Sequence, residues 1–369
     1  CMKGKAIKTL CAIALTTGLF TALPTGAEAF CLGSILGDAG KVLDTVHQYK
    51  ALEDEAHYKN ETEEGRQEVF ENMKETYGVA YNDYYNGQLD DIMSRLSQGI
   101  AEVDPTINDM PYLYFMCPDP NFNAFCSYGH VMCVNIGMFY LTTNPDEIAV
   151  VLGHEMGHGQ KKHVANALLK RAKTDYGAAI ISGSLSGTAL SDTVMDLAVN
   201  QVKTVQIGRK DEWEADNLSF DYIYHAGYNP GATAAIWQRV IEQMGDNSAS
   251  FVGEIFSPSD HPSNAQRRDN YEKKLNELSG KHVTIKKDSD TVQVNKKDFV
   301  TPAPAADMSS AERKYFVMGN LVSAYAHGQA AKQAEVVNGT VMLGNQAIMT
   351  PAEGDPTAEE LAALLNKIK

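Results

Sequence analysis

"LGHEMGHGQKKH", residues 152–163, is the stretch on which both the fold and the chemistry depend. It places Glu155 directly after His154 and three residues before His158. Residues four apart lie on one face of an α-helix, so a helix here would aim both imidazoles at one point. Glu155 lies about 100° round the same helix and can reach a water held at that point. This spacing favours a zinc hydrolase, in which two histidines bind the ion and a carboxylate takes a proton from water.

The residues before the motif predict that it lies on a helix. Asn144 is a good N-cap, Pro145 suits the first helical position, and Glu147 can close a capping box. A further histidine, His163, follows His154 by nine residues, and nine steps of 100° place it on the opposite face of one continuous helix. His163 is therefore a poor third ligand, and we expect it to pack or to form a hydrogen bond instead.

A second segment, "RKDEWEADNLSF" (209–220), offers a third ligand. Glu212 and Asp216 are four apart and share one helical face. Glu212 can bind the metal, and Asp216 can accept a hydrogen bond from a ligand imidazole and so fix its tautomer. Glu214 would point about 200° away from Glu212. A solvated acidic helix face is the alternative, because the chain carries a net charge of -15.

The N-terminal residues predict export. A basic segment with three lysines precedes a short apolar run and the small residues Ala27 and Ala29, which is typical of a secretory signal peptide cleaved after residue 29. An N-terminal membrane anchor is the alternative, although the run is shorter than the roughly 20 residues of a spanning helix. We therefore expect an exported protein of the periplasm or cell envelope, with no integral membrane span in the mature chain. Its net acidity disfavours nucleic acid as a partner.

Four cysteines remain after such cleavage: Cys31, Cys117, Cys126 and Cys133. An oxidising compartment permits disulfides, and the last three lie close enough in sequence for a local bridge. The full pairing stays open, because four cysteines allow three connectivities.

The periodicities predict an α+β chain that is mainly helical. Helical patterns cover residues 34 to about 104, the motif region, and 231–245 and 262–278, while residues 112–141 resemble strands. After these come two hairpins, and "TVQVNKKDFVTPA" (291–303) matches "TVMLGNQAIMTPA" (340–352) in register, with helical residues after each. We expect a tandem ββα repeat; chance similarity of two short hairpins is the alternative. The predicted units are the signal peptide (1–29), a catalytic domain (30–278) and a C-terminal repeat module (279–369).

The chain resembles the gluzincin zinc peptidases with the pattern HExxH…ExxxD, which include the CAAX prenyl endopeptidases, the HtpX-type peptidases and, closest in character, the soluble BepA-type periplasmic peptidases. The resemblance covers roughly residues 60–272. It rests on five stretches: "HEMGH", "EWEAD", the upstream "NAFCSYGHVMCVNIGMF", "HAGYNP" and the late "DHPSNAQR". His130 departs from the pattern, because the family often has a second glycine there.

This resemblance implies a zincin-like metallopeptidase domain with a small active-site sheet and one Zn²⁺ per chain. His154, His158 and Glu212 would be the zinc ligands and Glu155 the general base, with Asp216 supporting a ligand. It also implies that His261 and Arg267 lie near the cleft and take part in catalysis, and that His261 can cap the metal; surface capping of the loop is the alternative role of His261.

The expected substrate is an extended polypeptide, with unfolded or stalled envelope proteins as the class that the resemblance implies. We expect it to lie antiparallel against one strand, formed by His130, Val131, Met132, Cys133, Val134 and Asn135. Two alternatives stay open: a chaperone-like scaffold whose metal is capped by His261, and an envelope-binding protein that meets its partner through the C-terminal repeats.

Overall fold

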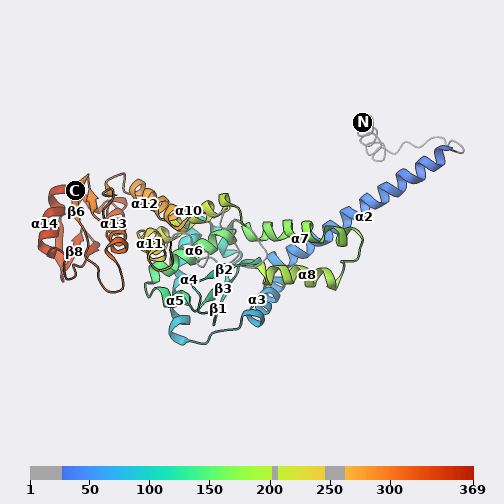
Figure 1. Cartoon of the computed structure of the whole chain (residues 1–369), viewed down its shortest axis with the longest axis horizontal. Helices are drawn as coiled ribbons and strands as arrows, with labels where there is room; N and C mark the ends of the chain where they lie inside the picture. Colours follow the sequence, from blue (N-terminus) through green and yellow to red (C-terminus); the bar gives the residue numbers. More distant parts are fainter. Residues whose placement is uncertain (1–26, 202–206, 246–261) are drawn as a thin grey trace.

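The computed structural model describes residues 27–201, 207–245 and 262–369, with the backbone alone for 27–42. The expectation of a mainly helical chain with small sheets is confirmed (Figure 1). The predicted signal peptide lies outside the described residues except for its last three positions. Among the residues described, no helix combines the length and the apolar composition that crossing a membrane requires.

Helices precede and surround a small first sheet. Those of the first three quarters of the chain are α2 (Ala27–Glu61), α3 (Glu63–Tyr77), α4 (Asp83–Val103), α5 (Met138–Leu141), α6 (Pro145–Gln160), α7 (His163–Ile181), α8 (Thr188–Val199), α10 (Arg209–His225), α11 (Ala232–Met244) and α12 (Asn264–Leu278). The motif segment 152–163 lies on α6 and at the start of α7, and the acidic segment lies on α10.

The first sheet has the strands β1 (Leu113–Cys117), β2 (Ala124–Cys126) and β3 (Val131–Asn135) in the order β1-β3-β2. β1 runs parallel to β3, and β2 runs antiparallel to it. β3 is therefore the central strand, and all five of its residues are buried. One face of the sheet packs on a core with α4 and α6, and the other on a second core with α3, α7 and α8.

Two further three-stranded sheets follow, each antiparallel and each followed by a helix. The first sheet and its helix form one unit, with β4 (Val283–Ile285), β5 (Val292–Val294), β6 (Lys297–Val300) and α13 (Ser310–Ala326). The second unit has β7 (Ala334–Val337), β8 (Thr340–Leu343), β9 (Gln346–Met349) and α14 (Ala358–Ile368). Each unit thus has three strands, where the sequence predicted a two-stranded hairpin. The additional strands are β4 and β7, which pair with β5 and β8 and are as long as these partners.

The C-terminal units share a core with the helices before them. One cluster of buried apolar side chains contains residues of α4, α6, α11, both later sheets and α13. Arg239 of α11 is 3.2 Å from Glu147 of α6 and also pairs with Glu312 of α13, and all three are buried. Glu147 therefore binds Arg239 and the hydroxyl of Thr142, rather than closing the predicted capping box.

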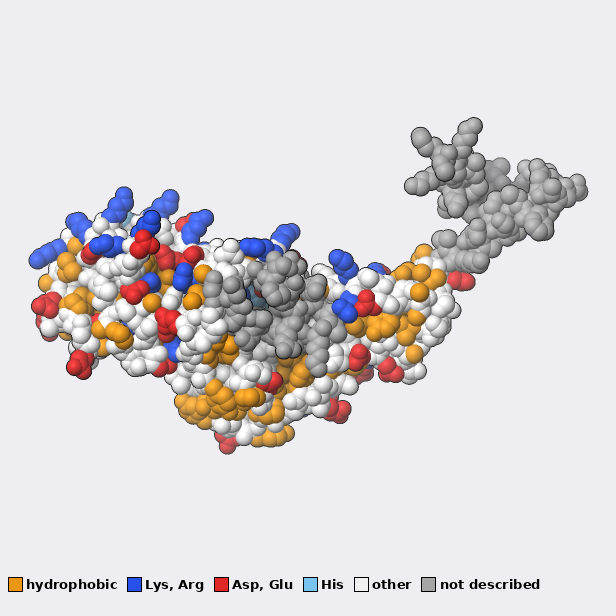
Figure 2. Space-filling view, viewed as in Figure 1, with side chains coloured by type: hydrophobic (Ala, Val, Ile, Leu, Met, Phe, Trp, Pro, Cys, Tyr) orange, Lys and Arg blue, Asp and Glu red, His pale blue; other side chains and the backbone are white. Residues whose placement is uncertain are grey.

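Charge is unevenly distributed over the surface. Figure 2 shows lysine and arginine side chains gathered along the outer margin of the C-terminal part, although the chain as a whole is acidic. The exposed lysines between the end of α12 and β6 are Lys273, Lys281, Lys286, Lys287, Lys296 and Lys297. The net charge of the sequence therefore does not describe each face of the molecule.

Candidate metallopeptidase site

Helix α6 holds the first two candidate ligands in the interior. Its N-cap is Asn144, whose side chain accepts a hydrogen bond from the amide of Asp146, and Pro145 occupies the first turn, as the sequence predicts. His154 and His158 are 3% and 2% exposed. A helix that is buried on nearly every side needs polar partners for its histidines, and the neighbouring helix α10 supplies two of them, Glu212 and Asp216.

Small residues bring α6 and α10 close together. A Cβ placed at Gly153 would lie 3.2 Å from the hydroxyl of Ser219, and one at Gly157 would lie 3.3 Å from the Cα of Ala215. These positions are four apart on each helix, so they form one contact strip. The close approach places the carboxylate of Glu212, on α10, beside the two histidines.

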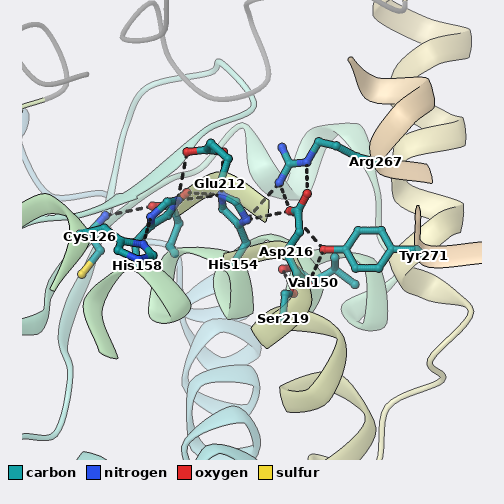
Figure 3. Close-up of polar contacts among 11 residues, drawn as sticks. Cys126, Val150, His154, His158, Glu212, Asp216, Ser219, Arg267 and Tyr271 are labelled. Atoms are coloured by element: carbon teal, nitrogen blue, oxygen red, sulfur yellow. Dashed lines mark hydrogen bonds and ion pairs between the residues drawn. The ribbon is translucent and has the colours of Figure 1, made fainter. Parts of the chain in front are cut away.

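Three side chains converge at the point where the helices meet (Figure 3). The Nε2 atoms of His154 and His158 are 3.1 Å apart. The carboxylate of Glu212 lies 3.5 Å from the first and 3.2 Å from the second. All the converging atoms can donate an electron pair, so a shared cation is the partner that suits them.

This donor set fits zinc. Ligand atoms about 2.0–2.1 Å from a tetrahedral ion lie roughly 3.3–3.4 Å from one another, and the three separations are close to that value. Two imidazoles with one carboxylate are a usual catalytic zinc set, which leaves a fourth position open. Burial, with the Arg267 cation adding to it, lowers the pKa of His154 to about 4, so its imidazole is neutral at pH 7, as a ligand must be.

Asp216 supports His154 from behind. Its Oδ1 lies 2.9 Å from Nδ1 of His154, and it also forms an ion pair with Arg267 and accepts a hydrogen bond from the Tyr271 hydroxyl (Figure 3). Burial favours the neutral acid, but Arg267 and His154 outweigh it and keep the pKa of Asp216 below its usual value. A charged Asp216 accepts the Nδ1 proton and so directs the lone pair of Nε2 towards the site.

Arg267 is part of this support. Its guanidinium binds both oxygens of Asp216, lies 3.7 Å from the ring centroid of Trp237, and is 4% exposed. Its Nη2 is also 3.0 Å from Nδ1 of His154. Nδ1 of His154 must carry a proton when Nε2 of the same ring binds a metal. We therefore assign the hydrogen bond of this N–H to Asp216 and treat the contact with Arg267 as packing. The structure thus places Arg267 beside the candidate ligands, with Asp216 as its ion-pair partner.

Glu155 is placed for proton transfer. Its carboxylate lies 4.0 Å from Nε2 of His154 and accepts a hydrogen bond of 3.3 Å from the backbone amide of Cys126 on β2. Burial raises the pKa of Glu155 to about 7, with the neighbouring Glu212 adding to the rise. A carboxylate with a pKa near neutrality can both take up and release a proton at physiological pH.

The expected docking of substrate on residues 130–135 needs correction. β3 is hydrogen-bonded on both sides, so it has no free edge for a peptide. The edge strand next to α6 is β2. His130 stacks on Tyr112 and has a φ of 54°, a left-handed conformation that glycine adopts most readily. Burial lowers the pKa of His130 to about 4, and its Nδ1 lies 2.8 Å from the Met110 carbonyl oxygen.

Two other expectations concern residues outside this cluster. His261 lies outside the described residues. Cys117, Cys126 and Cys133 are free and buried, in place of the expected local bridge. The pairing register explains part of this, because Cys126 points to the opposite face of the sheet from Cys117 and Cys133.

Several residues that contribute to the site were not predicted from the sequence. Tyr271 follows Arg267 by four residues on α12, and that spacing could have indicated a shared face. Gly153 and Gly157 share the same spacing and could have indicated a close helix contact. The Cys126 amide and Trp237 had no local indication.

The sequence model of peptidase family M48 matches residues 85–274, which is more than half of the chain. The match includes both motif helices and Arg267. The chain belongs to peptidase family M48. Among curated proteins, it is 27% identical to the metalloprotease LoiP of Escherichia coli over 66% of this chain and 84% of that protein.

Other relatives match over a smaller share. A putative beta-barrel assembly-enhancing protease of Vibrio cholerae is 24% identical over 43% of this chain and 33% of its own length. The mitochondrial metalloendopeptidase OMA1 of Schizosaccharomyces pombe is 27% identical over 52% of this chain and 55% of its own length. The chain thus spans about a third to four fifths of these M48 relatives. Their names and the family support a metalloendopeptidase with a metal cofactor.

Proposed function

We propose that this M48 member is a zinc-dependent endopeptidase with one Zn²⁺ per chain, bound by His154, His158 and Glu212. The observation that supports this most is the convergence of these three ligands with Glu155 beside them, all buried. Bound zinc would polarise the scissile carbonyl and lower the pKa of a water molecule. Glu155 is the residue that takes the proton from that water and passes it to the leaving amine.

We propose that the substrate adds as a strand to the free edge of β2. Asn123 and Ser127 bond to β3, through the Asn135 amide and the Val131 carbonyl. Backbone groups alternate in direction along a strand, so those of Ala124 and Cys126 face away from β3. The Cys126 amide already points to Glu155. A peptide paired with this edge would pass beside the base and the metal ligands, which suits extended chains better than folded ones.

We further propose that the protein is exported and degrades unfolded or stalled proteins in the periplasm or cell envelope. The basic, apolar and small-residue pattern of residues 1–29 supports export. The similarity to a protein named a beta-barrel assembly-enhancing protease supports an envelope substrate.

The domain division that we propose is a signal peptide (1–29), a peptidase domain (30–278) and a C-terminal tandem repeat (279–369) that meets an envelope partner. Each C-terminal unit has three strands and a helix, with a register shift at the equivalent point of its middle strand. Each also has a 2.7 Å hydrogen bond between threonine hydroxyls, Thr291 with Thr301 and Thr340 with Thr350. These matched features support a repeat.

The test combines metal analysis with cleavage of an unfolded protein. We expect purified protein to contain one zinc per chain and to degrade casein. The variant Glu155→Gln should keep its zinc and lose cleavage, because an amide cannot take the proton from water while the three ligands remain. Casein cleavage by Glu155→Gln at the wild-type rate, or zinc-free protein that still cleaves, would refute the proposal.

A further inference from the structure

The back of His158 contacts a second histidine. Nδ1 of His158 lies 3.0 Å from Nδ1 of His163, the first residue of α7. Lys162 between the two helices has a left-handed backbone with a φ of 56°, and this turn breaks the continuous helix that would carry His163 to the opposite face. The His163 ring thereby lies across from the His158 ring, with centroids 5.1 Å apart and planes at 71°.

The protonation states of the two rings follow from one another. A metal ion on Nε2 of His158 leaves the proton of that ring on Nδ1. This N–H points at Nδ1 of His163, which must then be the acceptor. The proton of His163 is therefore on its Nε2, which lies 3.4 Å from the carboxylate of Glu214. The Asp211 carboxylate lies further from the same nitrogen, at 3.9 Å.

We propose that His163 is a positioning residue that accepts the Nδ1 proton of His158 and fixes the tautomer and ring orientation with which His158 binds the metal. The inference rests on the metal site proposed above. It gives His158 the same kind of support that Asp216 gives His154. The two ligands differ in their acceptors, because His154 has a buried carboxylate and His158 has a neutral imidazole that a half-exposed carboxylate supports.

The same reasoning decides the role of a second cluster. His163, Asp211 and Glu214 also bring three ligand atoms within 4.8 Å of one another. A metal ion there would occupy Nε2 of His163 and leave the proton on Nδ1, facing the Nδ1–H of His158 at 3.0 Å with no acceptor between them. The two uses of His163 therefore exclude each other. A filled site at His154, His158 and Glu212 leaves His163 to act as the acceptor.

Two substitutions at His163 test the proposal. In His163→Asn, an amide oxygen takes the place of Nδ1 and can accept the proton, whereas His163→Leu fills similar space without an acceptor. We would measure zinc affinity against a competing chelator, the visible spectrum of the cobalt-substituted protein, and thermal unfolding of the metal-free protein. We expect His163→Leu to weaken zinc binding roughly 10–100-fold and to change the cobalt spectrum, and His163→Asn to restore most of both.

A packing role would give a different result. Wild-type zinc affinity and an unchanged cobalt spectrum in His163→Leu, or an equal loss in both variants, would overturn the proposal. If the leucine variant fails to fold, His163→Ala takes its place, because the smaller side chain creates no overlap. Failure of the metal site itself is distinguishable, since wild-type protein would then bind zinc no more tightly than a His154→Ala variant.

Discussion

At the scale of single residues, the direction of each carboxylate on α10 decides its role. Glu212 faces both ligand histidines and is 1% exposed, whereas Glu214 faces His163 with a half-exposed side chain. Glu212 and Glu214 are two positions apart in sequence, so a local motif alone does not distinguish their roles. The angle between their directions on the helix does distinguish them.

We expect Glu212→Ala to lower zinc affinity by more than the roughly 100-fold that loss of an outer support gives, because two histidines make an incomplete site. Glu214→Ala is the matched control and should change affinity by less than about 10-fold, because its contact with His163 is long and partly solvated. Competition with a chelator measures both. A larger loss from Glu214→Ala would show that α10 is turned the other way.

A second residue-scale expectation concerns the buried group of Glu147, Arg239 and Glu312. Burial, with the Glu147 carboxylate adding to it, raises the pKa of Glu312 from 4.5 to about 9. The folded protein therefore keeps a proton that the unfolded chain releases. This contribution to stability is fully present below pH 4.5 and is lost as the pH rises through about 9.

The variant Glu312→Gln lacks this titration but can still accept a hydrogen bond from Arg239. We expect the free energy of unfolding of the wild type to fall relative to that of Glu312→Gln between pH 5 and pH 9. Urea unfolding of both proteins at several pH values measures the difference. A constant difference across that range would contradict the assignment.

At the scale of elements, the site depends on the distance between α6 and α10. Gly153 and Gly157 on one helix meet Ser219 and Ala215 on the other, and no larger side chain fits without displacement. The distance between the helices sets the distance between Glu212 and the histidines. Packing of the two helices thus determines the geometry of the metal site.

We expect Gly157→Val to destabilise the protein by about 1–3 kcal/mol through overpacking and to weaken zinc binding, because the helices must move apart. Gly87→Ala on α4 is the control, since a Cβ there has no neighbour within 4 Å. Alanine in that helix should raise stability by roughly 0.5–1 kcal/mol and leave zinc affinity unchanged. Thermal unfolding and chelator competition measure both effects. Unaltered zinc affinity in a folded Gly157→Val protein would show that the helix spacing does not control the site.

At the scale of the whole molecule, the C-terminal units are packed onto the peptidase part. Besides the Arg239–Glu312 pair, the Tyr315 hydroxyl donates to Glu272 at 2.9 Å, and the backbone of α13 lies directly against Gly231. The sequence predicts a separate C-terminal repeat module at residues 279–369. The shared core predicts instead that its removal affects stability.

We expect a chain ending at residue 278 to unfold at a lower temperature than the full chain, because the apolar faces of α11 and α12 become exposed. Where it is folded at low temperature, it should still cleave a short peptide, since His154, His158, Glu212 and Glu155 all precede the cut. Adding residues 279–369 as a separate chain is the control and should restore stability. An unchanged unfolding temperature would show that the units are independent.

The sequence by itself determined the local parts of this protein. Helical periodicity and the Asn144 cap place His154, Glu155 and His158 in one turn of α6, and the same periodicity separates Glu212 from Glu214. These features depend on residues a few positions apart, whose relative directions an α-helix fixes.

Only the tertiary structure decided the rest. It made β3 the central strand, placed His163 behind His158 through a left-handed Lys162, joined Arg267 to Asp216 across 51 residues, and packed α13 on α11. These arrangements depend on contacts between distant segments. Local periodicity sets which face a side chain occupies, but which other element covers that face is set by packing of the whole chain.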